Sequence, residues 1–353
     1  MNRKGIVDAP VLLERHRQMM TIVLNRPEVL NSLSTEMIRL IQEAMNEAGA
    51  SRNIRWVLLR GAGDRGFCAG GDIKATAQAV KEGALHRTDQ FFEEEYALDL
   101  CIHDFPKPVI VMADGITMGG GLGLSAGADI VVATERTRMA MPESRIGFFP
   151  DVGATGWMFS KCLKGYPEYL GLTGYEMVGA ECVRVGFATH LISSKELPQV
   201  VQMLEEHSDT ISHEKPISTR QLRSILEPIT VKNIPEKPEM DEWVREYFSD
   251  RVSVGDILDN LRQCSVHSRL CEGVFMGVSE RSPTALVLTL QLLRQNEGRP
   301  MKRIFETDAK AAHFMLTHPD FLEGVRARLL DKDDQPRWQP SAIDEVGHLD
   351  IDI

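Results

Sequence analysis

Three consecutive glycines, Gly119, Gly120 and Gly121, follow the apolar segment 109–113 and open a small-residue segment, 121–128, that is predicted to be a helix. Glycine allows a backbone to approach another surface closely, and N–H groups at a helix start favour negative charge. The pattern therefore has two interpretations. The glycines either pack the helix tightly on a neighbouring element or direct backbone N–H groups at a ligand.

A second glycine-rich segment, residues 61–66, has the sequence G-A-G-D-R-G and follows a predicted strand. Its spacing fits the G-x-G-x-x-G pattern of dinucleotide sites, in which the glycines lead directly into a helix. Here they lead into a further loop, F-C-A-G-G-D, and Asp72 is suited to cap a helix that starts near Ile73. We therefore interpret residues 61–66 as a turn.

Hydrophobic periodicity places these segments in an α/β structure. It predicts a hairpin over 11–15 and 19–25, a helix over 34–49 capped by Ser34, and buried strands near 55–61, 109–113 and 130–133. Alternating strands and helices imply βα units. A stretch rich in proline and charge, 208–256, precedes helical patterns at 257–264, 284–295 and 302–316. We expect a core over residues 1–200 and a helical C-terminal region over 201–353 that completes or covers it.

Composition narrows the classes of partner. The net charge of −11 disfavours nucleic acid, and the absence of a long apolar segment disfavours a membrane span. The first residues lack the apolar stretch of a secretory signal. Six scattered cysteines, none in a C-x-x-C pair, are typical of reduced thiols in a cytoplasmic protein. Zinc binding by Cys264, His267 and Cys271 is disfavoured because a fourth ligand is missing.

The loop that continues the first glycine-rich segment, residues 69–73 (A-G-G-D-I), and the triplet 119–121, in this order and at this separation, resemble the two glycine loops of the crotonase (enoyl-CoA hydratase/isomerase) superfamily. Residues 24–33 and 172–186 resemble two further parts of that pattern. Residues 141–153, M-P-E-S-R-I-G-F-F-P-D-V-G, are similar to the 3-hydroxyisobutyryl-CoA hydrolase branch, as are residues 92–96, 115–121, 320–326 and 331–338. The resemblance covers about residues 11–340.

The resemblance implies a crotonase-like α/β core of repeated ββα units with a helical C-terminal region. It implies that the N–H groups of Gly71 and Gly120 hold the oxygen of a thioester carbonyl, and that Glu143 and Asp151 are catalytic. It also implies that substrate contacts Glu95 and the loop residues Ala69, Gly70, Asp72 and Ile73. Coenzyme A is then part of the substrate, with no separate cofactor or metal, and the chain is expected to form a homo-oligomer, a trimer or a hexamer.

These roles fit the residue types. Thioester cleavage develops negative charge on the carbonyl oxygen, and buried carboxyls with raised pKa values can activate water or attack the acyl carbon. The alternative for Glu143 is a charge at a helix start, for Asp151 a helix cap, and for Glu95 an exposed acidic face. The expected reaction is hydrolysis of a short 3-hydroxyacyl-CoA, with 3-hydroxyisobutyryl-CoA of valine breakdown as the leading substrate.

Two other functions are kept as alternatives. Hydratases of the superfamily usually carry a second glutamate two residues after the last glycine of the triplet, where this chain has Gly123. Hydration or isomerisation of an enoyl-CoA is therefore disfavoured. A non-catalytic acyl-CoA-binding protein is disfavoured by the presence of both Glu143 and Asp151.

Overall fold

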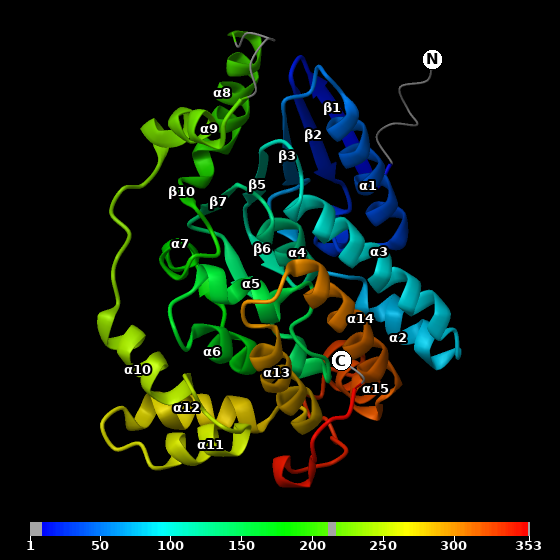
Figure 1. The fold of residues 1–353 in the computed structure, drawn as a ribbon, viewed down its shortest axis with the longest axis vertical. Coiled ribbons are helices and arrows are strands. Elements are labelled where there is room, and N and C mark those ends of the chain that lie inside the picture. Colours follow the sequence, from blue (N-terminus) through cyan, green and yellow to red (C-terminus); the bar gives the residue numbers. More distant parts are fainter. Residues whose placement is uncertain (1–8, 211–216, 352–353) are drawn as a thin grey trace. The chain divides into compact units, whose positions relative to one another are not determined.

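The computed structural model describes residues 9–210 and 217–351 (Figure 1). The segment on which the secretory-signal prediction rests, residues 1–8, lies outside the described residues. The chain forms two compact units. Unit 1 comprises Met1–Gly71, Ala97–Met139 and Met177–Glu236, and unit 2 comprises Asp72–Tyr96, Ala140–Glu176 and Lys237–Ile353. This division differs from the predicted boundary near residue 200, because the chain enters unit 2 twice before its C-terminal helices begin.

Unit 1 is built on a six-stranded sheet. The strand order is β1-β2-β3-β5-β7-β10, antiparallel between β1 and β2 and parallel elsewhere. The predicted hairpin and buried strands are confirmed, with bounds β1 (Val11–His16), β2 (Met19–Leu24), β3 (Trp56–Gly61), β5 (Val109–Ala113), β7 (Ile130–Thr134) and β10 (His190–Ile192). Central strands buried on both faces explain their continuous apolar runs.

A second sheet of four short strands has the order β4-β6-β8-β9. Its strands are β4 (Gly66–Cys68), β6 (Ile116–Met118), β8 (Arg138–Ala140) and β9 (Met177–Val178). The chain therefore places β3, β5 and β7 in the large sheet and the strand after each in the small one. In two cases a helix follows, α2 (Ile73–Lys81) after β4 and α4 (Gly120–Ala126) after β6. These are the repeated ββα units of the predicted fold.

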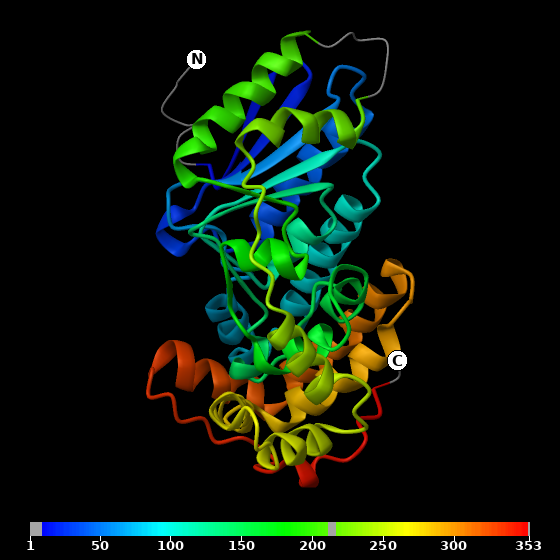
Figure 2. The ribbon, with the colours of Figure 1, turned by 90° about the vertical axis from the view of Figure 1, so that its left-hand side faces the viewer.

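Helices cover the large sheet of unit 1. Helix α1 (Thr35–Ala50) packs on β1, β2 and β3 through its apolar face, and Ser34 caps it as predicted, accepting from the Met37 N–H at 3.3 Å. Helices α8 (Leu197–Thr210) and α9 (Thr219–Leu226) cover one face of the sheet (Figure 2). Alternate residues of the strands, including Trp56, Leu58 and Ile110, meet Val200 and Leu222 in that layer. Helix α7 (Ala180–Val185) packs beside β7 and β9.

Unit 2 is helical. It contains α2, the first part of α3 (Leu85–His103), α5 (Ala154–Lys161), α6 (Tyr166–Thr173), α10 (Pro238–Phe248), α11 (Val254–Arg262), α12 (Ser268–Ser279), α13 (Pro283–Asn296), α14 (Met301–Thr317) and α15 (Pro319–Val325). Helix α13 is buried along most of its length and packs against α5, α6 and α14, which makes it the centre of this unit. No helix of the described residues is long and apolar enough to span a membrane.

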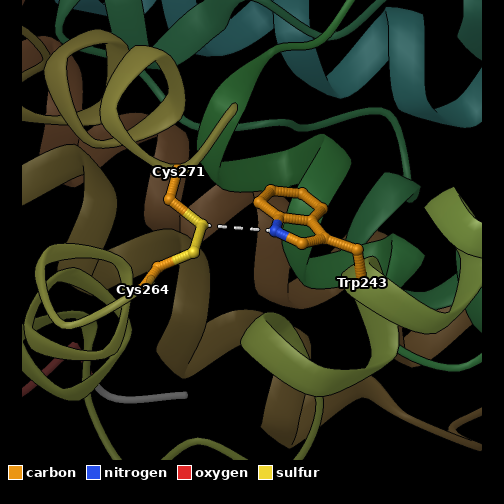
Figure 3. The surroundings of a disulfide bond; sticks show 3 residues. All are labelled: Trp243, Cys264 and Cys271. Atoms are coloured by element: carbon orange, nitrogen blue, oxygen red, sulfur yellow. Dashed lines mark hydrogen bonds between the residues drawn. A yellow bond between two sulfur atoms is a disulfide. The ribbon is translucent and has the colours of Figure 1, made fainter. Parts of the chain in front are cut away.

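The expectation that every cysteine is reduced is wrong for one pair. Cys264 and Cys271 form a disulfide with a Cα–Cα distance of 6.3 Å, and the Trp243 Nε1–H donates to Cys271 Sγ at 3.3 Å (Figure 3). Seven residues of continuous helix would separate the Cα atoms by about 10 Å. The chain instead turns between α11 and α12, which brings the two thiols within disulfide range. The same bond removes both sulfurs from a zinc site.

Candidate active site

Three carboxylates predicted to lie in the site are gathered within unit 2. Helix α3 carries Glu95, the short 3₁₀ helix Glu143–Ile146 begins at Glu143, and Asp151 stands three residues before α5. Glu95 is 2% exposed, so it does not lie on the exposed acidic face given as its alternative, and Asp151 is 5% exposed. Glu143 keeps some exposed surface, but its Oε2 is enclosed and accepts no hydrogen bond from the described residues.

Burial and mutual repulsion set the charge of this cluster. Burial first, and the charge of Asp151 second, raise the pKa of Glu95 and of Glu143 well above that of an ordinary glutamate. Burial also raises the pKa of Asp151 to about 7, although a hydrogen bond from Tyr96 offsets part of the effect. Within the part of the chain that the structure describes, no arginine or lysine acts on these three carboxyls. Such a cluster holds protons at neutral pH and can exchange them, which is what general acid–base chemistry requires.

Two residues to which the sequence analysis assigned no role contact this cluster. The Tyr96 hydroxyl donates to Asp151 Oδ2 at 2.8 Å. Asp308 of α14 is fully buried and accepts from the Gly153 N–H at 2.7 Å, two residues after Asp151. Asp308 could have been found from the sequence, because it occupies the apolar face of a helix that also buries Ile304, Ala311 and Ala312.

Aromatic side chains from the segments of the narrower resemblance pack on one another. Phe92 stacks on Phe148 with ring centroids 5.5 Å apart, and Phe148 also meets Phe149 and Phe321 at 4.9 and 5.8 Å. These rings come from segments 92–96, 141–153 and 320–326, three of the five that carry this resemblance. Phe92 also meets the ring of Tyr96, the donor to Asp151, at 5.8 Å, so the aromatic group adjoins the cluster.

The segments of this motif also pack backbone to backbone. Gly147 has φ +69°, and a Cβ there would collide with the carbonyl of Asp320, while a Cβ on Gly324 would collide with the backbone of Ile146. Glycine is therefore required at both positions. Asp320 itself is structural: it accepts from the Ser282 hydroxyl at 2.5 Å and from the Gln339 N–H at 2.7 Å.

Arg326 organises the segment that follows α15. It forms ion pairs with Glu323, Asp331 and Asp333 at 2.8, 2.7 and 2.6 Å. The conspicuous charges of residues 320–333 therefore belong to the framework of unit 2 rather than to the carboxylate cluster.

The two glycine segments lie together in unit 1. The Leu33 N–H donates to the Gly70 carbonyl at 2.8 Å, and a Cβ on Gly70 would lie 3.2 Å from the Gly120 nitrogen. Gly120 is the first residue of α4, so its N–H has no acceptor within the helix. A Cβ on Gly121 would collide with the Cys68 carbonyl. Gly121 thus serves tight packing, which is the first interpretation of the triplet, and the second, a ligand held by the N–H of Gly120, stays a prediction.

The remaining predicted loop residues divide between the units. Ala69 and Gly71 are partly exposed in unit 1, and Gly70 is buried with φ +94°. Asp72 caps α2, accepting from the Ala75 N–H at 3.3 Å, and Ile73 is the first residue of that helix. Residues 61–66 form a turn between β3 and β4, as interpreted from the sequence. Among the described residues no group of histidine, cysteine, aspartate and glutamate has the arrangement of a metal site.

Known proteins resemble this chain over nearly its whole length. The family model described as enoyl-CoA hydratase/isomerase matches residues 19–352. The mitochondrial 3-hydroxyisobutyryl-CoA hydrolase of Gallus gallus is 35% identical, with 98% of this chain and 88% of that protein covered. Those of Rattus norvegicus and Homo sapiens are 37% and 34% identical, each over 97% of this chain and 88% and 87% of theirs.

Solved structures agree with this relationship. A carnitinyl-CoA dehydratase from Mycobacterium thermoresistibile superposes with a TM-score of 0.87 at 30% identity, over 98% of this chain and 96% of that one. An enoyl-CoA hydratase from Rhodobacter sphaeroides gives a TM-score of 0.84 at 26% identity, over 96% and 95%. On the fold, the family model and these relatives together, the chain belongs to the enoyl-CoA hydratase/isomerase, or crotonase, family.

Proposed function

We propose that the protein hydrolyses a short 3-hydroxyacyl-CoA thioester, with 3-hydroxyisobutyryl-CoA as substrate and 3-hydroxyisobutyrate and free CoA as products. One observation carries the proposal: Glu95, Glu143 and Asp151 form an enclosed acidic cluster, and no cation among the described residues neutralises it. The names of the relatives support the choice of acyl group. The reaction would be a step of valine breakdown.

The proposed reaction needs water as its only co-substrate. A C–O bond forms at the acyl carbon, the C–S bond breaks, and the sulfur leaves with a proton. Glu143 either takes a proton from the attacking water or attacks the acyl carbon itself, and water then releases the acid. Asp151, with a pKa of about 7, is suited to exchange protons with water and with the leaving sulfur near neutral pH.

The family resemblance implies that backbone N–H groups stabilise the negative charge on the thioester oxygen. In this proposal the N–H groups of Gly71 and Gly120 hold the oxygen as it becomes negative, which is worth about 10²–10³ in rate per donor. Glu95 is proposed to bind the substrate's 3-hydroxyl group. It is suited to this because its Oε1 is buried and accepts no hydrogen bond from any described residue.

A thiol-release assay over a panel of CoA esters tests the proposal. The panel contains 3-hydroxyisobutyryl-, 3-hydroxypropionyl-, isobutyryl- and crotonyl-CoA, and loss of enoyl absorbance is followed in parallel for crotonyl-CoA. We expect fast thiol release from the 3-hydroxy esters and slow release from isobutyryl-CoA. Rapid hydration of crotonyl-CoA without thiol release would instead support the hydratase function named by the structural relatives. Binding without turnover of any ester would support the non-catalytic alternative.

Other properties remain predictions from the sequence. We propose that the chain acts without metal or separate cofactor, binds no nucleic acid and forms a trimer or hexamer. We also retain the cytoplasmic location, which differs from the mitochondrial one in the names of the vertebrate relatives. Sedimentation analysis tests the oligomeric state, and imaging of a tagged full-length protein tests the location.

A further inference from the structure

We propose that Tyr96 and Asp308 are positioning residues that hold Asp151 in one orientation and leave its Oδ1 oxygen for substrate or water. This inference rests on the proposed hydrolase function and goes beyond it, because neither residue belongs to the predicted set of site residues.

Tyr96 fixes one oxygen of Asp151. Its hydroxyl donates to Oδ2 at 2.8 Å, and the tyrosine is 3% exposed. The ring lies between Phe92 and Phe305, with centroid distances of 5.8 and 5.9 Å, so the phenol cannot swing to another partner. No side chain of the described residues donates to Oδ1 of Asp151. The two oxygens thus differ in their side-chain partners: Oδ2 accepts from Tyr96, and no described side chain donates to Oδ1, although a backbone hydrogen bond also acts on the carboxyl.

Asp308 fixes the backbone that carries Asp151. Val152 and Gly153, which follow it, have φ values of +50° and +73°. The left-handed conformation is unfavourable for a β-branched residue such as valine and persists only where neighbours enforce it. Asp308 accepts from the Gly153 N–H at 2.7 Å, and the Trp157 Nε1–H donates to the Val152 carbonyl at 3.0 Å. These two bonds hold the turn and with it the direction of the Asp151 side chain.

The same contacts act on the ionisation of Asp151. The titratable groups that act on one another here are Glu95 and Tyr96 of α3, Glu143, Asp151, and Asp308 of α14. Burial first, and then the neighbouring carboxylates, raise the pKa of Tyr96, so the phenol keeps its proton and donates a hydrogen bond to Asp151. This hydrogen bond lowers the pKa of Asp151, which burial alone would raise further. Among the described residues no side-chain donor acts in this way on Glu95 or Glu143, and the pKa of Glu143 is lowered only by a hydrogen bond from its own backbone.

The Tyr96→Phe variant tests the first half of the inference. It keeps the ring and removes the bond. We expect kcat to fall about 10- to 100-fold, which is the effect of losing one hydrogen bond to a charged group. KM should change by less than about threefold. The acid limb of the kcat profile should also move to higher pH, because the Asp151 pKa rises. A change in packing alone would not move that limb.

Tyr166→Phe is the matched control. Its hydroxyl donates to Asp241 Oδ1 at 2.6 Å, a bond of the same type in the same unit but away from the cluster. We expect kcat within about twofold of wild type and an unchanged pH profile. The ester used is the one the wild type hydrolyses fastest. If the wild type releases no thiol from any ester, the proposed function itself fails. If the wild type is active and Tyr96→Phe shows the same kcat and acid limb, only the positioning role is overturned.

Asp308 is tested by a pair of variants. Burial raises the pKa of Asp308, so its neutral form resembles asparagine, and Asp308→Asn keeps an oxygen for the Gly153 N–H. We expect Asp308→Asn to retain kcat within about threefold and Asp308→Ala to lose about tenfold or more. If Asp308→Ala does not fold, Asp308→Asn decides alone. A loss in Asp308→Asn as large as that in Tyr96→Phe overturns the role, because the acceptor is still present.

Discussion

Replacing Asp151 by asparagine should make the protein more stable above neutral pH while it removes activity. A carboxyl whose pKa is higher in the folded state binds its proton more tightly there than in the unfolded chain. Its contribution to the free energy of unfolding is therefore intact below the unfolded pKa and is lost as the pH rises through the folded one. For Asp151 this window runs from 3.8 to about 7.

The size of the effect follows from the same two values. A rise from 3.8 to about 7 corresponds to about 4 kcal/mol of stability lost once Asp151 is ionised in the folded protein. Glu95 and Glu143 titrate with it and take up part of the charge in the variant, so we expect a net gain of about 1–3 kcal/mol. Asparagine keeps an oxygen that can accept from Tyr96, so the packing of the turn is retained.

Urea unfolding of both proteins at about pH 5 and about pH 8.5 measures this difference. The gain should be larger at the higher pH. Asp241→Asn, at the other tyrosine–aspartate pair of unit 2, controls for the loss of a negative charge outside the cluster. A variant no more stable than wild type at the higher pH, or a gain that is equal at both, refutes the argument that burial of the charged form strains this site.

The other predictions concern turnover. Glu143→Gln should abolish thiol release while CoA-ester binding stays nearly intact, which steady-state kinetics and a binding titration check. The double variant Glu143→Gln, Asp151→Asn should have a kcat scarcely lower than that of the more damaging single variant. Glu95→Ala should reduce the preference for the 3-hydroxy ester over isobutyryl-CoA more than it lowers isobutyryl-CoA turnover. If the wild type has equal kcat/KM for the two esters, the pocket does not recognise the hydroxyl. Gly123→Glu should lower hydrolysis and raise crotonyl-CoA hydration only weakly. Thiol release measures the first rate and loss of enoyl absorbance the second.

Much of unit 1 could be predicted because its signals are local. Ser34 precedes an apolar helical face, and the strand from Val109 to Ala113 is apolar at every position, so both elements have nearly the predicted bounds. The hairpin between β1 and β2 is equally local. In these elements the hydrophobic periodicity of the segment itself indicates whether it is a helix or a strand.

The errors have a different physical origin. Helices α9 and α10 lie in the stretch 208–256 that is rich in proline and charge, and both are too short to display a long helical period. The disulfide depends on a change of direction after α11 that the spacing of Cys264 and Cys271 does not reveal. The division into two units depends on long-range packing, since residues 140–176 join helices that begin a hundred residues later.

The carboxylate cluster falls between these cases. The motif resemblance predicts Glu95, Glu143 and Asp151 as site residues, and the structure places the three acids near one another in unit 2. Tyr96 adjoins Glu95 in the chain, yet its role could not be predicted, because its hydrogen bond to Asp151 spans 55 residues of sequence. Asp308 comes from a helix more distant still.

Aromatic packing and raised pKa values occur in the same segments of this unit. Phe92, Phe148 and Phe321 pack on one another, and burial raises the pKa of Asp151, which lies in the same motif as Phe148, to about 7. Unpaired buried charge is unfavourable, so the enclosure must be rigid enough that the acids cannot reach solvent. The close backbone contacts at Gly147 and Gly324 supply that rigidity, because neither position tolerates a side chain. The motif is therefore longer than the acids alone require, because its glycines fix the backbone between Glu143 and Asp151 against the segment 320–324.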